Sequence, residues 1–400
     1  MSSPADMSIG TPASSQPSAM GRICLVSGGT GGHLMPALAL ARGLCEQGEA
    51  PLLLLEGRDV ERELVRRELP GIAAVDLPRA RHSWSLPLWL SRTVWNTRAL
   101  LRRERIVGAI STGGRASLPV ALAARSLRLP LFLLEQNAVV GRANRWLLPF
   151  ARRMYVGLPG RGEQHPRALR TGTPLRPGFG QVDRAAARRS LGLSLEQPVV
   201  LVTGGSQGAR VLNERVPGVL QRVRAKLQIV HLSGLGNDAA VRHRYAEVAR
   251  DTVANVRPVA ADMDRLFAAA DLVICRGGGT TIAELCAVGR AAIVLPYPHH
   301  RDRQQFHNAE VLARIGAAVV LDEVGLDPAD LREQVEALLA EPSRLAAMGD
   351  AARRLRMPDT VGSILADVRR QLPGGEGARV TPAAAPLRPR AAAPRRGGVA

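Results

Sequence analysis

Short apolar runs alternate with helix-like segments along most of this chain. The first series of runs comprises Ile23–Ser27, Pro51–Leu55, Val107–Ser111, Leu131–Leu134 and Arg153–Val156. A second series comprises Val199–Thr203, Ile229–Leu232, Leu272–Cys275 and Ala292–Leu295. Strands that alternate with helices form right-handed βαβ units, which build parallel sheets. The alternation therefore predicts an α/β fold with two Rossmann-like, doubly wound domains.

The length of 400 residues, with 46% apolar residues, suffices for two cores. Thr171–Pro198 interrupts the alternation with prolines and a polar helix, so we place the interdomain linker there. Residues 1–20 lack the basic and apolar regions of a signal peptide and are predicted to be a disordered leader. Residues 373–400 form a basic, low-complexity segment that we expect to be a disordered tail.

The net charge of +19 is compatible with a nucleic acid, an anionic substrate or an anionic membrane as partner. Lys226 is the one lysine among 54 basic residues, so part of the charge reflects a general bias towards arginine. The sequence carries no zinc-finger, basic-zipper or RNA-recognition signature, which argues against a nucleic-acid partner. No apolar run approaches the roughly 20 residues of a spanning helix, so we expect any membrane contact to be peripheral.

The four cysteines are far apart and lack the spacing of a metal site. They are Cys24, Cys45, Cys275 and Cys286. Each lies in an apolar segment, which predicts buried free thiols in a reducing compartment.

Glycine-rich turns follow four of the predicted strands. They are Gly28–His33, Thr112–Gly114, Gly204–Gly208 and Gly277–Thr281. Glycine permits close backbone approach, and a helix that starts behind such a turn offers free N–H groups to an anion. Two turns in each half predict a cleft that holds a phosphorylated ligand from both sides. None has the Walker or GxGxxG pattern, which argues against phosphoryl transfer and a dinucleotide oxidoreductase.

Four of these segments resemble the MurG family. They are GGTGGHLMPALALA (28–41), LEQNAVVGRANRWL (134–147), GGSQGARVLNERVP (204–217) and CRGGGTTIAEL through DRQQFHNAEVL (275–312). The resemblance runs from about residue 21 to 372 and implies the GT-B fold, in which two Rossmann-like domains face a cleft. It implies an acceptor- and membrane-facing domain over 21–175, a UDP-sugar-binding domain over 176–357, and a helix over 358–372 that crosses back to the first domain.

The resemblance also implies an activity. The family transfers N-acetylglucosamine from UDP-N-acetylglucosamine to the 4-hydroxyl of lipid-linked N-acetylmuramoyl-pentapeptide, which converts lipid I to lipid II in peptidoglycan synthesis. We expect an inverting hexosyltransferase on the cytoplasmic face of the cell membrane, with no cofactor, no metal and no nucleic-acid partner. Rival hypotheses are a GT-B enzyme that glycosylates diacylglycerol or another lipid, a UDP-sugar epimerase, and a basic nucleic-acid-binding protein.

Two residues are candidates for the general base. His33 lies where a helix is predicted to begin, and the positive end of a helix favours a neutral imidazole. The alternative for His33 is a histidine of the helix cap or the core. Glu135 is the competing base, and its alternative is a structural carboxylate at the end of a strand. In the family the position before it is commonly histidine, whereas here it is Leu134.

The resemblance assigns further residues to the donor. They are Thr30, Gly31, Gly32, Asn137, Arg176, Ser206, Ala260, Gly279, Thr280, Thr281, Ile282, Ala283, Glu284, Gln304 and Gln305. Glu284 is implied to bind the ribose hydroxyls, although Thr281-x-x-Glu284 also has the pattern of a capping box. Ser206 is either a phosphate ligand or a plain helix N-cap. Asp262-Met263-Asp264 has a DxD pattern, but its position favours a helix cap over a metal site.

A membrane patch is predicted between residues 84 and 105, where three of the four tryptophans lie among arginines. Its members are Trp84, Leu88, Trp89, Trp95, Arg102 and Arg103. Apolar and aromatic side chains beside arginines are typical of an interfacial helix on anionic headgroups. The alternative is a core helix whose arginines form a solvated face.

Overall fold

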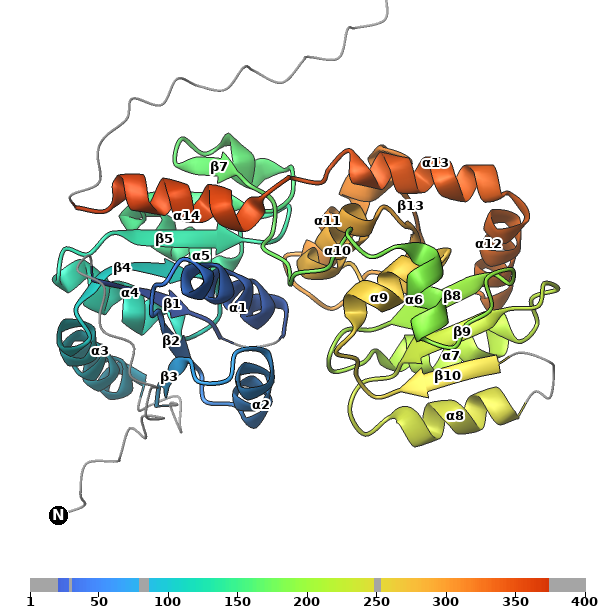
Figure 1. Ribbon diagram of the computed structural model, residues 1–400, viewed down its shortest axis with the longest axis horizontal. Helices are drawn as coiled ribbons and strands as arrows, with labels where there is room; N and C mark the ends of the chain where they lie inside the picture. Colours follow the sequence, from blue (N-terminus) through green and yellow to red (C-terminus); the bar gives the residue numbers. More distant parts are fainter. Residues whose placement is uncertain (1–20, 29–30, 79–85, 248–252, 374–400) are drawn as a thin grey trace, which may run out of the picture.

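The computed structural model describes residues 21–28, 31–78, 86–247 and 253–373. Its strands form two sheets, one in each half of the chain, and every strand pairing is parallel (Figure 1). The predicted α/β class with two doubly wound sheets is therefore confirmed. The leader, most of the tail, Thr30 and Trp84 lie outside the described residues.

The first sheet has the strand order β3-β2-β1-β4-β5-β6-β7. Its strands are β1 (Arg22–Val26), β2 (Leu52–Leu55), β3 (Ala73–Asp76), β4 (Ile106–Ser111), β5 (Leu131–Glu135), β6 (Arg153–Val156) and β7 (Ala168–Arg170). The second sheet has the order β10-β9-β8-β11-β12-β13. Its strands are β8 (Val199–Thr203), β9 (Gln228–Leu232), β10 (Val253–Arg257), β11 (Leu272–Cys275), β12 (Ala291–Val294) and β13 (Ala318–Val320).

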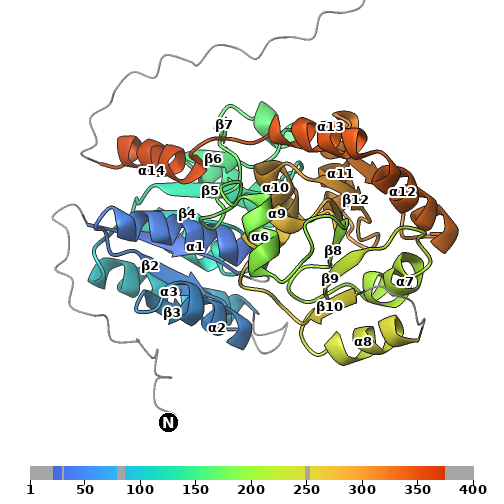
Figure 2. The same cartoon turned by 45° about the vertical axis from the view of Figure 1, so that its right-hand side comes forward.

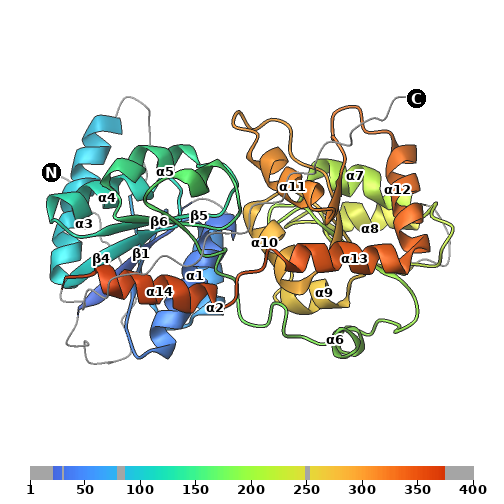
Figure 3. The same ribbon diagram turned by 90° about the horizontal axis from the view of Figure 1, so that it is seen from above.

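Helices cover both faces of each sheet, as the buried apolar strands require. In the first half they are α1 (Gly31–Glu46), α2 (Asp59–Glu68), α3 (Leu86–Arg103), α4 (Ser117–Ser126) and α5 (Arg142–Leu147), with the 3₁₀ turns η2 (Leu148–Phe150) and η3 (Arg161–Gln164). In the second half they are α6 (Arg184–Ser190), α7 (Arg210–Leu220), α8 (Asp238–Ala246), α9 (Met263–Ala269), α10 (Gly279–Val288), α11 (Gln304–Arg314), α12 (Pro328–Ala340) and α13 (Pro342–Arg353). Figure 3 shows α3, α4 and α5 on one side of the first sheet, opposite α1.

The last helix, α14 (Thr360–Gln371), returns to the first sheet and lies beside α1 (Figure 2). Its apolar side chains Ile364, Leu365 and Val368 are buried in the core that α1 forms with β1 and β2. The hydroxyl of Tyr155 donates to Asp367 of this helix (3.0 Å), and burial beside that carboxylate raises the pKa of the phenol. The helix is thereby fixed to the first sheet by packing and by a buried hydrogen bond.

The strand order places both topological switch points at the interface between the two halves. In the first sheet the order reverses between β1 and β4, and in the second sheet between β8 and β11. Figure 1 shows β5 pointing towards the second half and β10 pointing back towards the first. The turns that follow these strands are therefore brought together at the carboxyl ends of both sheets, where ligands bind in doubly wound folds.

The expectation for the cysteines is wrong at one position. Cys24, Cys275 and Cys286 are buried, and burial raises the pKa of each thiol. Cys45, however, is exposed near the end of α1. The apolar segment around it is the buried stripe of an amphipathic helix, and Cys45 lies off that stripe.

Candidate active site

His33 lies in the first turn of α1, and its tautomer follows from its surroundings. The Nδ1 atom is 2.7 Å from the carbonyl oxygen of Thr112, the residue that follows β4. A carbonyl oxygen can only accept a hydrogen bond, so Nδ1 carries the proton of the neutral ring. Nε2 is then the unprotonated nitrogen, and the half-buried ring can accept a proton there.

The turn after β4 holds the imidazole in place. Gly113 has φ +108°, and a Cβ at that position would lie 2.8 Å from the ring of His33. Glycine is required here for both its conformation and its lack of a side chain. The Thr112 carbonyl also accepts from the Gln136 amide (2.9 Å), while the Thr112 hydroxyl donates to the carbonyl of His33 (2.9 Å). Gln136 directly follows β5, so the segments after β4 and β5 are joined through the Thr112 carbonyl.

Glu135 is a buried carboxylate whose oxygen atoms are already engaged. One oxygen accepts from the backbone N–H (3.1 Å) and the side-chain amide (2.9 Å) of Asn137. The other accepts from the N–H of Gly141 (2.7 Å) and the amide of Asn144 (2.9 Å). Four donors occupy the lone pairs that a general base would use. Glu135 therefore organises the loop from residue 136 to 141 and joins it to Asn144 of α5.

Residues predicted from the two halves of the sequence meet across the interface. The hydroxyl of Thr280 donates to the carbonyl of Gly32 (2.9 Å). A Cβ on Gly31 would lie 3.4 Å from the hydroxyl of Ser206. A Cβ on Gly141 would lie 3.4 Å from the amide nitrogen of Gln304. Both halves therefore contribute to one site, at the start of α1, α10 and α11.

Asn308 of α11 is a central residue that the sequence reasoning missed. It is completely buried, and its side-chain oxygen accepts from the N–H of Ala138 (2.8 Å). Its amide nitrogen donates to the side chain of Asn137 and to the carbonyl of Gly277, both at 2.9 Å. One amide thus links the loop after β5 to the turn after β11. The sequence feature that could have identified Asn308 is its position on the apolar side of an amphipathic helix, beside Ala309 and Leu312.

Glu284 is buried, and the capping-box interpretation of this residue is wrong. The α10 helix begins at Gly279 after the N-cap Gly278, so Thr281 already lies inside the helix. Burial raises the pKa of the Glu284 carboxyl to about 7, although the positive charge of Arg176 partly opposes this shift. No described residue donates a hydrogen bond to this carboxylate, so its acceptor atoms are available to a ligand.

Three further predicted donor residues have partners or exposure that the structure defines. Ser206 is exposed, and it does not cap a helix, because α7 begins at Arg210 after Ala209. Gln305 accepts from the N–H of Tyr297 (2.9 Å). Arg176 contacts Glu68 of α2 (3.1 Å) and the carbonyl of Ala261 (3.0 Å), so it bridges the two halves.

The residues of the DxD pattern have structural partners. Asp262 occupies the N-cap position of α9, but its side chain makes no capping hydrogen bond and instead pairs with Arg257 (3.4 Å). Asp264 lies against the turn at Gly178. Within the described part of the chain, no three His, Cys, Asp or Glu side chains are grouped as a metal site would require.

Comparison with known proteins decides the family. Residues 23–156 match the glycosyltransferase family 28 N-terminal domain, and residues 199–363 match the family 28 C-terminal domain. A protein of Stutzerimonas stutzeri, named UDP-N-acetylglucosamine--N-acetylmuramyl-(pentapeptide) pyrophosphoryl-undecaprenol N-acetylglucosamine transferase, is 39% identical over 86% of this chain and 96% of its own length. A Pseudomonas entomophila protein of the same name is 34% identical over the same shares. The chain belongs to the MurG family.

Solved structures agree with this membership. The crystal structure of MurG from Acinetobacter baumannii aligns with a TM-score of 0.71 and 27% identity, over 88% of this chain and 99% of that protein. A putative UDP-N-acetylglucosamine 2-epimerase from Listeria monocytogenes aligns with a TM-score of 0.64 over 88% of this chain and 96% of its own. Its identity is 16%, so this second likeness shows the fold alone.

In this MurG-family chain the predicted membrane patch lies largely on α3. Leu88 and Trp95 have 62% and 74% of their surface exposed, and Arg102 and Arg103 are also exposed. Trp89 is partly buried, and its indole N–H donates to the carbonyl of Pro78 (2.6 Å). The opposite face of α3, which includes Thr97 and Leu101, is buried. The alternative of a core helix therefore describes that face, and the exposed face is the one that carries the predicted patch. None of the described helices has the length and apolarity needed to cross a bilayer.

Proposed function

We propose that this chain transfers N-acetylglucosamine from UDP-N-acetylglucosamine to the 4-hydroxyl of lipid-linked N-acetylmuramoyl-pentapeptide. The names of relatives up to 39% identical across nearly the whole folded chain support this substrate pair. The observation that carries the chemistry is the contact between Nδ1 of His33 and the Thr112 carbonyl, which makes Nδ1 the donor and leaves Nε2 of the neutral tautomer as an acceptor. That placement suits a base that must act on an acceptor bound between the two halves.

The reaction we propose is a single displacement with inversion. Nε2 of His33 takes the proton of the acceptor hydroxyl while that oxygen attacks the anomeric carbon of the donor. The bond between the anomeric carbon and the UDP oxygen breaks, and the electron pair leaves with UDP. The imidazolium that forms is stabilised because Nδ1 donates more strongly to the Thr112 carbonyl once the ring is charged. Glu135 acts by positioning Asn137, not by taking the proton.

The second half would hold the nucleotide. Glu284 suits the ribose hydroxyls, because its buried carboxylate has no donor from the described residues and would accept two hydrogen bonds. The start of α10 and the turn at Ser206 face the first half, where helix N–H groups and glycine-rich backbone favour the pyrophosphate. Gln304 and Gln305 at the start of α11 offer amides to the sugar hydroxyls. These dipoles stabilise the departing UDP without a metal.

Peripheral contact with the cytoplasmic face of the membrane completes the proposal. The exposed side chains of Leu88 and Trp95 would enter the headgroup region, with Arg102 and Arg103 on anionic lipids. Each arginine near an anionic surface contributes about 1 kcal/mol of binding free energy. A soluble enzyme would thereby reach an acceptor whose prenyl chain stays in the bilayer.

The test is product identification with purified protein. We would incubate it with several UDP-sugars and with either a short-chain lipid I analogue or diacylglycerol, and identify products by mass spectrometry. The proposal predicts one product, the N-acetylglucosaminyl derivative of the lipid I analogue. Transfer to diacylglycerol alone would replace the acceptor. Conversion of the UDP-sugar without any acceptor would indicate an epimerase.

A further inference from the structure

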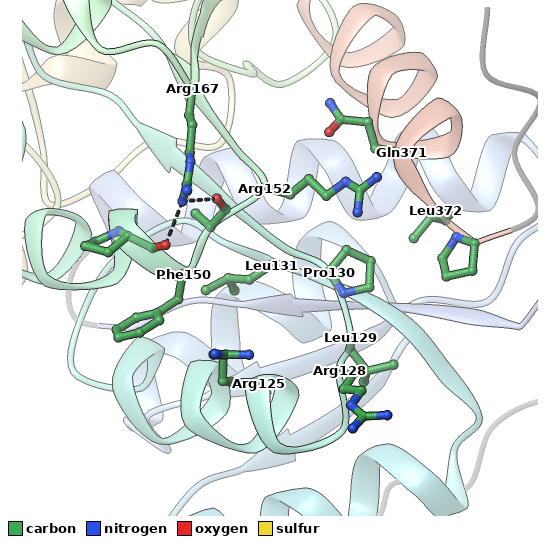
Figure 4. Close-up of a pocket in the computed structure, with 13 residues that line it drawn as sticks. Arg125, Arg128, Leu129, Pro130, Leu131, Phe150, Arg152, Arg167, Gln371 and Leu372 are labelled. Atoms are coloured by element: carbon green, nitrogen blue, oxygen red, sulfur yellow. Dashed lines mark hydrogen bonds between the residues drawn. The ribbon is translucent and has the colours of Figure 1, made fainter.

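Besides the candidate active site, the structure has a pocket in the first half, away from the interface between the two sheets (Figure 4); we call it the second pocket. Its volume is about 710 Å³. It is lined by the end of α4, the start of β5, the segment from η2 to β6, and the residues at the end of α14. Because it lies at the amino end of β5, it is at the opposite end of the strand from His33 and Glu135. It is therefore separate from the proposed transfer site.

The pocket is positively charged, and none of the described residues that line it is acidic. Arg125, Arg128 and Arg152 have exposed side chains, and none of them forms an ion pair with a carboxylate of the described residues. Figure 4 shows Arg125 on the α4 side, and Arg152 extending towards Gln371 of α14. Guanidinium groups without carboxylate partners around one hollow favour an anion with several acceptor oxygens, and above all a phosphate.

Arg167 has a different role in the same pocket. Its Nη1 donates to the carbonyl groups of Leu148 (3.0 Å), Pro149 (2.6 Å) and Ala151 (2.8 Å). These bonds fix the turn that carries Phe150, as the dashed lines in Figure 4 show for two of the carbonyls. Arg167 therefore forms a rigid wall. The guanidinium of Arg125 lies over the Phe150 ring at 5.9 Å from its centroid, and Arg128 and Arg152 have no carboxylate partner among the described residues.

The backbone at the end of α4 fixes the position of one of these arginines. Arg128 has φ +57°, in the left-handed region that glycine adopts at much lower cost. Its N–H donates to the carbonyl of Arg125 (3.1 Å), and that of Leu129 donates to Ala124 (2.9 Å). The Arg128 side chain therefore projects from a hydrogen-bonded helix end beside the pocket.

Apart from Gln371, the other described lining residues are apolar, and the pocket opens beside exposed aromatic residues. Leu129, Leu131 and Leu372 line it, and 52% of the surface of Phe150 is exposed at its edge. Trp146, one helical turn before Phe150, is 68% exposed. A ligand that satisfies this lining combines a phosphate with hydrocarbon. A free phosphate would use the arginines but leave the apolar surface without a partner.

We propose that this pocket binds the phosphate headgroup of an anionic phospholipid, with Arg125, Arg128 and Arg152 as its ligands. The acyl chains would run over Phe150 and Trp146 into the bilayer. The pocket adjoins α4, which packs against α3, so headgroup and patch can engage one membrane surface. The inference rests on the peripheral membrane contact proposed above. It adds a specific headgroup site to the α3 patch, which was defined only by exposed apolar side chains and arginines.

The test uses a short-chain, water-soluble phosphatidylglycerol as probe, so that binding is measured without a bilayer. Full-length protein and an Arg128→Gln/Arg152→Gln variant would be compared by titration calorimetry. Loss of two charge-assisted contacts should weaken probe binding roughly tenfold or more. The matched control is Arg189→Gln/Arg244→Gln, which removes the same charge from exposed arginines of the second half. The control should bind the probe like the unmodified protein.

Three further results decide the assignment. A Leu88→Ser/Trp95→Ser variant of the α3 patch should keep probe binding, whereas its sedimentation with phosphatidylglycerol vesicles should fall. Equal weakening by the pocket variant and the control would overturn the site, because only net charge would then matter. Inorganic phosphate that binds as tightly as the lipid probe would overturn the lipid assignment in favour of a free-phosphate site. Transfer to the soluble acceptor analogue, measured on the same samples, reports on the proposed activity independently.

Discussion

The buried carboxylate of Glu284 should make donor binding depend on pH in a direction that the structure fixes. Burial raises its pKa to about 7 from an ordinary 4.5, so the free enzyme holds a large protonated fraction at neutral pH. Ribose hydroxyls donate to the ionised form, and donor binding should therefore release a proton. With a pKa near 7, the ionised fraction rises from roughly a tenth at pH 6 to roughly nine tenths at pH 8.

The affinity for UDP-N-acetylglucosamine should thus rise roughly tenfold from pH 6 to pH 8. The pyrophosphate of this donor is esterified at both ends and does not titrate in that range. Glu284→Gln keeps the shape of the side chain but removes the charge. It should weaken binding by about 1.5–3 kcal/mol at pH 8 and abolish the dependence on pH that the carboxylate contributes.

Stability should change in the opposite sense. A folded-state pKa above the unfolded value means that the native protein binds the proton more tightly. The carboxylate therefore destabilises the fold progressively as pH rises from about 4.5 to about 7, by an amount on the order of 3 kcal/mol. Glu284→Gln should melt at the same or a higher temperature at pH 8. Titration calorimetry beside thermal melts checks both effects, and unchanged donor affinity with a lower melting temperature would refute the reasoning.

His33→Ala should lower kcat on the order of 10²–10⁴-fold while donor affinity changes much less, and a mild loss would remove the imidazole as general base. Glu135→Ala should mainly lower the melting temperature, because four hydrogen-bond donors lose their partner; a large kcat loss in a protein of normal stability would reassign the base. Turnover should persist in excess EDTA. If EDTA abolished turnover and added magnesium restored it, this prediction would be contradicted. Trp95→Ser with Arg102→Glu and Arg103→Glu should abolish sedimentation with anionic vesicles but spare turnover of a soluble acceptor; normal sedimentation would place the patch elsewhere.

Much of the fold could be predicted because buried parallel strands leave a strong signal in the sequence. Runs such as Leu52–Leu55 and Leu272–Cys275 are apolar throughout because both faces of each sheet are covered. Glycine-rich turns also identify the ends of these strands, since glycine is needed wherever the backbone or His33 approaches closely.

Helix starts were less predictable, because tertiary contacts decide where a helix begins. Thr281 has the sequence pattern of a cap, yet α10 starts at Gly279, where the turn after β11 meets the loop after β5. The capping-box interpretation failed for that reason. Asn308 was missed for a related reason, since its partners come from both halves of the chain and only the folded structure brings them together.

The surface around the second pocket was also beyond sequence reasoning. The tryptophans of α3 are close in sequence, whereas Trp146 and Phe150 lie on another helix and a 3₁₀ turn. The arginines of the pocket are separated by up to 42 positions, between Arg125 and Arg167, and look like any others in an arginine-rich chain. Only the folded structure, in which the end of α4 lies beside the start of β5, shows that they surround one hollow.

The stereochemistry of the product tests the proposed mechanism most directly. The sugar is α-linked in UDP-N-acetylglucosamine, and a single displacement with His33 as base must invert that centre. We would isolate the product formed from this donor and a short-chain lipid I analogue, and read its anomeric configuration from the proton coupling in an NMR spectrum. The mechanism predicts a β-linked N-acetylglucosamine on the 4-hydroxyl of the muramoyl residue. An α-linked product would contradict it.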